Sequence, residues 1–216
     1  MREPVGVILA GGQGRRLGGA KATISLAGRP LLTHPLAAMH AALGADQRPL
    51  GDGPRLAVVA KPGTSLPALG AVLLWTEPGE PSHPLVGLIR ALEGAGGRAV
   101  LVCPVDLPFI TPETLRRLAA TPSRRAPALL AAHDGIAQPL LGRWEPAALA
   151  GLRSALRDGT GDSLPPMRAV AQSLGAHLIE VDADELENIN TPADLAHAEV
   201  RLSRRPGSPG QPNVNE

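Results

Sequence analysis

Short apolar runs alternate with segments of helical spacing along most of the chain. Residues 5–10, 56–60 and 99–103 are continuous apolar runs that are too short for a helix with a polar face, and they are typical of buried strands. Leucines and a methionine recur on one side of the segment 31–43, which predicts a helix. Further strands are predicted at 23–26, 71–74, 128–132, 136–141 and 177–181. Further helices are predicted at 85–93, 146–156, 166–174, 192–202 and from Pro112 onward.

This alternation of strands and helices predicts an α/β protein with a mostly parallel sheet covered by helices on both faces. The 216 residues suit one domain, which we place over residues 1–202. His133, Asp134 and Gly135 predict a hairpin-like turn between two of the strands. Residues 203–216 are rich in Pro, Gly, Ser, Arg and Asn and contain almost no core residues, so we predict a disordered tail there.

Composition narrows the functional classes. Apolar residues make up 44% of the chain and only Phe109, Trp75 and Trp144 are aromatic, so the core must be aliphatic. The formal charge of +1 argues against a nucleic-acid binder and requires any phosphate affinity to be local. No apolar run of about 18 residues and no leader pattern stands out, so we expect neither a membrane span nor a signal peptide. Cys103 is the single cysteine, which fits a reducing compartment, and we expect a cytoplasmic protein.

The histidines and the cysteine give no indication of a metal site or a reactive thiol. The six histidines show no zinc-binding spacing. His83 lies in the proline-rich segment 78–84. From there it could reach the active site, but we expect a solvated loop residue. Cys103 lies in an apolar run and is expected to be a small core residue.

A glycine-rich loop follows the first apolar run, in the stretch VGVILAGGQGRRLGGAK. A loop with so few side chains lets backbone N–H groups approach a ligand closely, and Arg15, Arg16 and Lys21 add positive charge. At the carboxyl end of a strand, these features predict a polyphosphate site. A Walker loop is excluded because Lys21 comes one residue late, and a dinucleotide fingerprint is excluded because Leu17 stands at the third glycine position. A glycine-rich surface turn without a ligand is the alternative interpretation.

Asp106 is a second candidate. It follows a buried run in the stretch VLVCPVDLPFI, which places it at the carboxyl edge of a central strand. A carboxylate in that position is costly unless it is paired or holds a metal, and Mg²⁺ is typically bound by one or two carboxylates together with substrate phosphates. The alternative is that Asp106 caps a backbone turn between two prolines.

The third candidate is the stretch around Thr191. Thr191, Pro192 and Asp194 match the N-cap, first and third positions of a helix start. Asn188 and Asn190 precede this helix, where they either shape the turn or bring an oxygen ligand to a metal. The sequence leaves both interpretations open.

The three stretches LAGGQGRRLGGAK, CPVDLPF and NINTPADL, in this order and at these separations, resemble the molybdenum cofactor guanylyltransferase family and its close nucleotidyltransferase relatives. The resemblance implies a Rossmann-like three-layer αβα fold and transfer of GMP from GTP to molybdenum-loaded molybdopterin, with release of pyrophosphate and with Mg²⁺ as cofactor. It also implies possible contacts with molybdoenzymes or cofactor chaperones.

The resemblance also implies roles for individual residues. The catalytic group comprises Lys21, Arg16 and Asp106. The nucleotide-binding group comprises Leu9, Ala10, Gly11, Gly12, Gly14, Arg15, Lys21, Glu77 and Asp106. Asp106 and Asn190 are the expected metal ligands, and Gln138 and Asn188 are expected on the acceptor side.

Two departures from the family pattern bear on the substrate. Ala20 stands where many relatives have Asp before the loop lysine, and Lys61 stands near the place where some guanylyltransferases have Asn. Alternative substrates are therefore CTP with the same pterin, or a nucleotide with a sugar phosphate. A non-catalytic nucleotide-binding regulatory module is the alternative of a different class.

Overall fold

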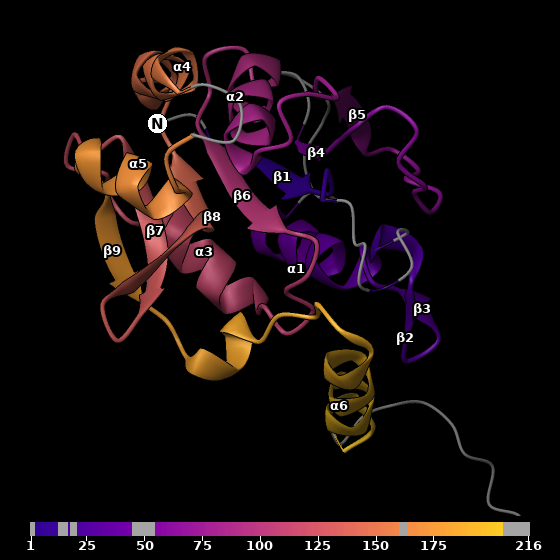
Figure 1. The fold of residues 1–216 in the computed structure, drawn as a ribbon. Coiled ribbons are helices and arrows are strands. Elements are labelled where there is room, and N and C mark those ends of the chain that lie inside the picture. Colours follow the sequence, from indigo (N-terminus) through magenta and orange to yellow (C-terminus); the bar gives the residue numbers. More distant parts are fainter. Residues whose placement is uncertain (1–2, 13–16, 18–20, 45–54, 160–163, 205–216) are drawn as a thin grey trace, which may run out of the picture.

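A mixed sheet forms the centre of the molecule in the computed structural model, which describes residues 3–12, 17, 21–44, 55–159 and 164–204 (Figure 1). Within these residues seven strands are hydrogen-bonded in the order β5-β4-β1-β6-β8-β7-β9. All of them run in the same direction except β8, which is antiparallel to both of its neighbours. In sheet order, the strands are β5 (Leu73–Thr76), β4 (Leu56–Ala60), β1 (Val5–Leu9), β6 (Val100–Pro104), β8 (Ile136–Trp144), β7 (Ala128–His133) and β9 (His177–Glu180).

The strands are continuous apolar runs because both of their faces are buried. In β1, Val5 and Val7 pack into one core cluster while Ile8 packs into the other, as the alternation of side chains in a strand requires. Gly6 lets a helix approach this strand closely, since a Cβ there would lie 2.6 Å from Met39 Cγ. The predicted buried parallel strands are confirmed.

Helices cover both faces of the sheet and complete the three predicted layers (Figure 1). The helices α1 (Thr33–Leu43) and α3 (Pro112–Ala120) pack on one face, and α2 (Pro84–Gly94), α4 (Ala148–Asp158) and α5 (Met167–Ser173) pack on the other. In the described part of the chain no helix is both long enough and apolar enough to cross a membrane.

A third, smaller core lies beside one end of the sheet. The last helix, α6 (Pro192–Ser203), packs there near the two-stranded sheet of β2 (Ser25–Leu26) and β3 (Arg29–Pro30), as Figure 1 shows. Phe109, Ile189 and Ala198 are buried in this core. Two 3-10 turns, Lys21–Thr23 and Ala183–Leu186, complete the described elements.

Most element boundaries agree with the predictions to within two residues. The strand predicted at 71–74 begins later, at Leu73, because Gly70 in a left-handed conformation and a Val72 N–H to Leu69 C=O bond form a turn first. The predicted hairpin is confirmed, with Asp134 and Gly135 both at positive φ. Residues 205–216 of the predicted tail lie outside the described residues.

Backbone hydrogen bonds continue past the strand ends and position the loops that follow. Ala10 N–H donates to Val59 C=O, Val105 N–H donates to Leu9 C=O, and Glu77 N–H donates to Ala60 C=O. The segments after β1, β4, β5 and β6 are thereby held together at one edge of the sheet. Ligands of parallel α/β sheets bind at this edge.

Candidate functional site

A cavity of about 210 Å³ opens at the carboxyl edge of the central strands. Its walls come from the ends of β1, β4 and β6, from the loop after β5 and from the start of α2. The described residues that line it are Leu9, Gly11, Gly12, Lys21, Val59, Lys61, Glu77, Ser82, His83, Pro84, Gly87, Pro104, Val105, Asp106 and Leu140. Six of the predicted nucleotide-binding or catalytic positions therefore line one cavity: Leu9, Gly11, Gly12, Lys21, Glu77 and Asp106.

Lys21 connects the residues predicted to hold a metal. Its ammonium donates to Asp106 Oδ2 and to Asn190 Oδ1, each over 2.8 Å. The side chains of Lys21 and Asp106 are 10% and 22% exposed, so the ion pair sits in the cavity wall. Two oxygens from distant parts of the chain thus converge on one positive charge.

The start of α6 holds Asn190 in this position. Asp194 Oδ2 accepts from the backbone N–H groups of Asn190 and Thr191, and Thr191 Oγ1 accepts from Asp194 N–H, which forms a capping box. These hydrogen bonds lower the pKa of the Asp194 carboxyl. Ile189 N–H also donates to Asp106 C=O. The two interpretations of Asn190 are therefore compatible, because its backbone shapes the helix start while its carboxamide reaches Lys21.

Glu77 is a buried carboxylate, 6% exposed, in the wall of the same cavity. Two glycines make room for it, since a Cβ would lie 1.9 Å from its Oε1 at Gly11 and 2.6 Å from its Oε2 at Gly87. Burial raises the pKa of the Glu77 carboxyl, and the positive charge of Lys61 offsets part of this rise. The carboxylate is thus pressed against the glycine-rich loop and the start of α2.

A second cavity of about 490 Å³ adjoins the first. Gln138 and Asn188, the predicted acceptor-side residues, both line it together with Met167 and Arg168. The residues that line both cavities are His83, Pro84, Pro104, Asp106 and Leu140. Asp106 therefore stands at the junction between the two hollows.

The remaining predicted positions are placed as follows. Ala10 is buried in the core and is not among the cavity-lining residues. Gly14, Arg15 and Arg16 lie outside the described residues, as does Ala20. Among the described residues, no three His, Cys, Asp or Glu side chains gather to hold a metal by themselves.

The nucleotide-side cavity also contains polar residues to which the sequence analysis assigned no role, among them Lys61 and His83. Lys61 donates to Gly79 C=O and Ser82 Oγ, which ties the end of β4 to the proline-rich loop. His83 was expected to be solvated, but it is partly buried in the wall that both cavities share. Its place directly before Pro84 at a helix start was the available signal, because such a position is an N-cap.

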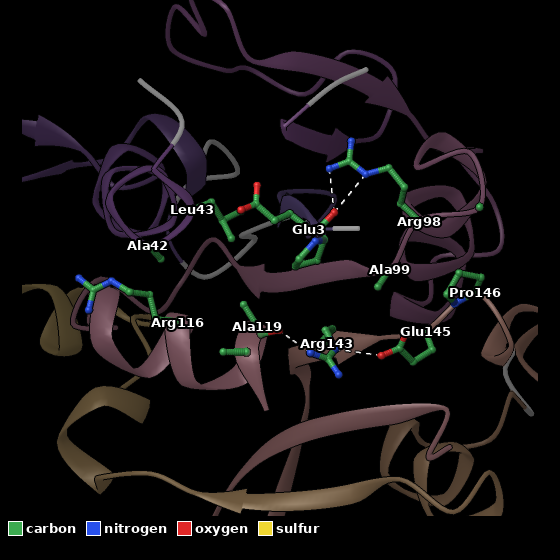
Figure 2. Close-up of a pocket in the computed structure, with 13 residues that line it drawn as sticks. Glu3, Ala42, Leu43, Arg98, Ala99, Arg116, Ala119, Arg143, Glu145 and Pro146 are labelled. Atoms are coloured by element: carbon green, nitrogen blue, oxygen red, sulfur yellow. Dashed lines mark hydrogen bonds and ion pairs between the residues drawn. The ribbon is translucent and has the colours of Figure 1, made fainter. Parts of the chain in front are cut away.

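A larger hollow, of about 630 Å³, lies at the opposite edge of the sheet (Figure 2). Its arginines are engaged within the protein: Arg98 donates to Glu3 C=O, and Arg143 donates to Glu145 and to Ala119 C=O. Arg116 is paired with Glu113. The hollow is remote from the strand ends that carry Lys21 and Asp106, so size alone does not identify the active site.

Comparison with known proteins agrees with this geometry. A model of the MobA-like NTP transferase domain matches residues 6–177. The chain belongs to this family. A molybdenum cofactor guanylyltransferase of Acidiphilium cryptum is 35% identical over 199 residues, which cover 90% of this chain and 93% of the relative. A molybdenum cofactor guanylyltransferase of Rhodobacter capsulatus is 31% identical over 206 residues, covering 91% and 95%. This MobA-like chain is accordingly a nucleotidyltransferase.

Solved structures support the fold of this MobA-like protein. Molybdopterin-guanine dinucleotide biosynthesis protein A from Archaeoglobus fulgidus superposes with a TM-score of 0.71 at 23% identity, over 93% of this chain and 99% of that one. A 2-C-methyl-D-erythritol 4-phosphate cytidylyltransferase from Thermus thermophilus superposes with a TM-score of 0.65 at 24% identity, again over 93% and 99%. The nucleotidyltransferase fold predicted from the sequence is confirmed.

Proposed function

We propose that this protein transfers GMP from GTP to molybdenum-loaded molybdopterin, forming the guanine dinucleotide cofactor and releasing pyrophosphate. The observation that carries the proposal is the contact of Lys21 with Asp106, which lines both adjoining cavities, and with Asn190. One cavity has the residues expected for a nucleotide, and the other has those expected for an acceptor. The names of full-length relatives at 31–35% identity support GTP and the pterin as the two substrates.

The nucleotide occupies the cavity beside Gly11 and Gly12. No atom of the described residues lies within 4 Å of a Cβ built on Gly12, so these residues leave room for a ligand to approach the backbone closely. Lys21 and Lys61 supply positive charge for the triphosphate in the same wall. From the sequence, we propose that Arg15 and Arg16 of the same loop also contact the phosphates.

Glu77 favours guanine as the base. Guanine presents neighbouring N–H donors on its N1 and N2, and a carboxylate accepts such a pair through its two oxygens. Cytosine offers a single exocyclic amino donor beside acceptor atoms, so it satisfies the same carboxylate less well. The buried position of Glu77 against Gly11 makes this discrimination strong, because an unpaired buried carboxylate is costly.

The chemical step needs placement and charge neutralisation more than proton transfer. A phosphate monoester has a second pKa near 6, so the acceptor oxygen is already anionic at neutral pH. That oxygen attacks the α-phosphorus in line; a new P–O bond forms, and the bond to the β-phosphate oxygen breaks and leaves pyrophosphate. Lys21 neutralises charge on the phosphates, while backbone amides and the cavity walls hold the two anions in position for in-line attack.

The residues present fit a divalent cation. Asp106 Oδ2 and Asn190 Oδ1 already converge on a positive charge, the ammonium of Lys21, and oxygen donors of this kind suit Mg²⁺. Asp106 and Asn190 would hold the ion together with substrate phosphates, and the ion would supply further neutralisation of phosphate charge. The proposed cofactor is Mg²⁺, which is common among nucleotidyltransferases.

The deciding experiment is a panel of the four nucleoside triphosphates with purified molybdenum-loaded molybdopterin and Mg²⁺, in which pyrophosphate release is followed. We expect turnover with GTP. Preference for CTP would show that the protein is a cytidylyltransferase. If the pterin gave no turnover and a sugar phosphate in its place did, the acceptor would be a sugar phosphate. The proposal also includes a cytoplasmic site of action, which the lone buried thiol of Cys103 fits, and delivery of the product to a molybdoenzyme or a cofactor chaperone.

A further inference from the structure

His83 occupies the wall that the two cavities share. It precedes Pro84, the first residue of α2, and its backbone has the extended conformation of an N-cap residue, with φ −139° and ψ 142°. It is one of the few residues that line both the nucleotide-side and the acceptor-side cavity, and Asp106 is another. The ring therefore borders the place where the α-phosphate and the acceptor phosphate must meet.

The cap fixes the tautomer of the ring. Leu85 N–H donates to His83 Nδ1 over 3.2 Å, so Nδ1 acts as an acceptor and carries no proton. A neutral imidazole with an unprotonated Nδ1 carries its proton on Nε2. Partial burial also lowers the pKa of His83, which favours the neutral ring. The ring thus has one N–H donor, at Nε2, while Nδ1 accepts the hydrogen bond of the cap.

This donor has no partner within the described residues. The hydrogen bonds of the His83 side chain in that part of the protein are accounted for by the bond from Leu85. Nδ1 is turned to the helix start, and Nε2 is the ring nitrogen left for a ligand in the cavities that His83 lines. A donor held in place before the substrates arrive costs no reorganisation during the reaction.

We propose that His83 is a further catalytic residue of this site, whose Nε2–H donates to a non-bridging oxygen of the α-phosphate while the acceptor attacks. Negative charge on these oxygens is redistributed as the new bond forms and pyrophosphate leaves, so the hydrogen bond strengthens in the transition state. The ring stays neutral throughout and takes no proton. This inference rests on the proposed nucleotidyl transfer but not on the identity of the base or the acceptor.

Two amide substitutions separate the donor from the cap. In His83→Asn the side-chain oxygen replaces Nδ1 and accepts from Leu85 N–H, but the distal donor is gone; Asn is a favoured N-cap residue. In His83→Gln the amide nitrogen lies near the place of Nε2 and keeps the donor, while the cap is weakened. His177→Asn, on the exposed edge strand β9, is a control for loss of an imidazole elsewhere.

The experiment measures kcat and KM for both substrates, with whichever nucleotide and acceptor the wild-type protein uses, and thermal unfolding of each variant. We expect His83→Asn to keep the wild-type melting temperature and KM values while kcat falls by about a hundredfold, the scale for one preorganised donor. His83→Gln should retain about ten times more kcat than His83→Asn despite the weaker cap. His177→Asn should match the wild type.

Equal kcat for His83→Asn and the wild type would overturn the role of His83 and leave guanylyl transfer intact. The role would also be overturned if His83→Gln had both a lower melting temperature and a lower kcat than His83→Asn. In that case the only role of His83 would be to cap α2. Preference of the wild type for another nucleotide or acceptor would overturn the proposed substrates, while the comparison of the two His83 variants would still decide the role of the ring.

Discussion

Lys21 lies between the two oxygens proposed to hold a divalent cation, so the lysine and the metal would compete in the nucleotide-free protein. Replacing Lys21 by Met removes the ammonium and keeps most of the side-chain volume. Asp106 Oδ2 and Asn190 Oδ1, each 2.8 Å from the lysine nitrogen, then become free for a cation. We therefore expect Lys21→Met to bind metal better without nucleotide, although it transfers nucleotide worse.

The magnitude follows from the burial of the pair. An exposed ion pair contributes about 0–1 kcal/mol, and a hydrogen bond to a charged group about 1.5–3 kcal/mol. Since the side chains of Lys21 and Asp106 are 10% and 22% exposed, we take an intermediate value of about 1.4 kcal/mol, which corresponds to about a tenfold change in affinity. Turnover should fall by at least about a hundredfold, because a preorganised charge on the phosphates is lost.

The assay is titration of the nucleotide-free protein with Mn²⁺, followed by electron paramagnetic resonance of the free ion. Lys61→Met is the matched control: its ammonium lies in the same cavity but donates to Gly79 C=O and Ser82 Oγ, away from Asp106. The control should change Mn²⁺ affinity by less than about threefold, because the Lys61 ammonium bonds to Gly79 and Ser82 and leaves Asp106 and Asn190 paired with Lys21. Unchanged or weaker Mn²⁺ binding by Lys21→Met would refute the competition.

Three further predictions concern the site and the core. Asp106→Asn should leave the melting temperature nearly unchanged and lower pyrophosphate release by at least about a hundredfold, so wild-type-like turnover would exclude Asp106 from catalysis. Burial raises the pKa of Glu77, and in the proposed function the charged carboxylate binds guanine. GTP affinity measured by calorimetry should therefore fall as pH drops through that raised pKa. Glu77→Gln should bind weakly with a flat profile, and an equally steep profile in this variant would contradict the assignment. Gly142→Ala should destabilise the fold by about 1–3 kcal/mol in urea unfolding, because its Cβ would lie 2.3 Å from Leu129 C=O; an unchanged midpoint would show that β7 and β8 yield easily.

The sequence predicted the strand layers well because burial on both faces leaves an unbroken apolar run, as in β4 and β6. It also predicted the capping box at Thr191, since the side chains that make it are close in sequence. The reversed direction of β8 had no local signal beyond the hairpin turn at Asp134 and Gly135. That reversal places the start of β8, with Gln138, at the edge of the sheet where the other strands end.

The candidate site was predictable where a residue directly follows a strand and was not predictable where a loop folds back. Asp106 follows β6, and its position at the sheet edge was foreseen. Lys61 directly follows β4, whereas His83 joins it in one cavity because the loop between β5 and α2 returns over the strand ends. The residue before Pro84 could be identified as an N-cap from the sequence, but the path of that loop could not. The direct contact of Lys21 with Asn190 spans 169 positions of sequence, so it depends on docking of α6.

This dependence on α6 has a consequence for how the protein matures on the ribosome. The sheet strands β1, β4 and β6 are complete within the first 104 residues, whereas Asn190 and the helix that holds it come at the end of the chain. A nascent chain therefore contains these strands early, but Asn190 can reach Lys21 only after α6 has emerged and packed in the core that contains Phe109. A chain that ends before α6 would contain all the strands of the sheet but would lack the helix that holds Asn190 beside Lys21.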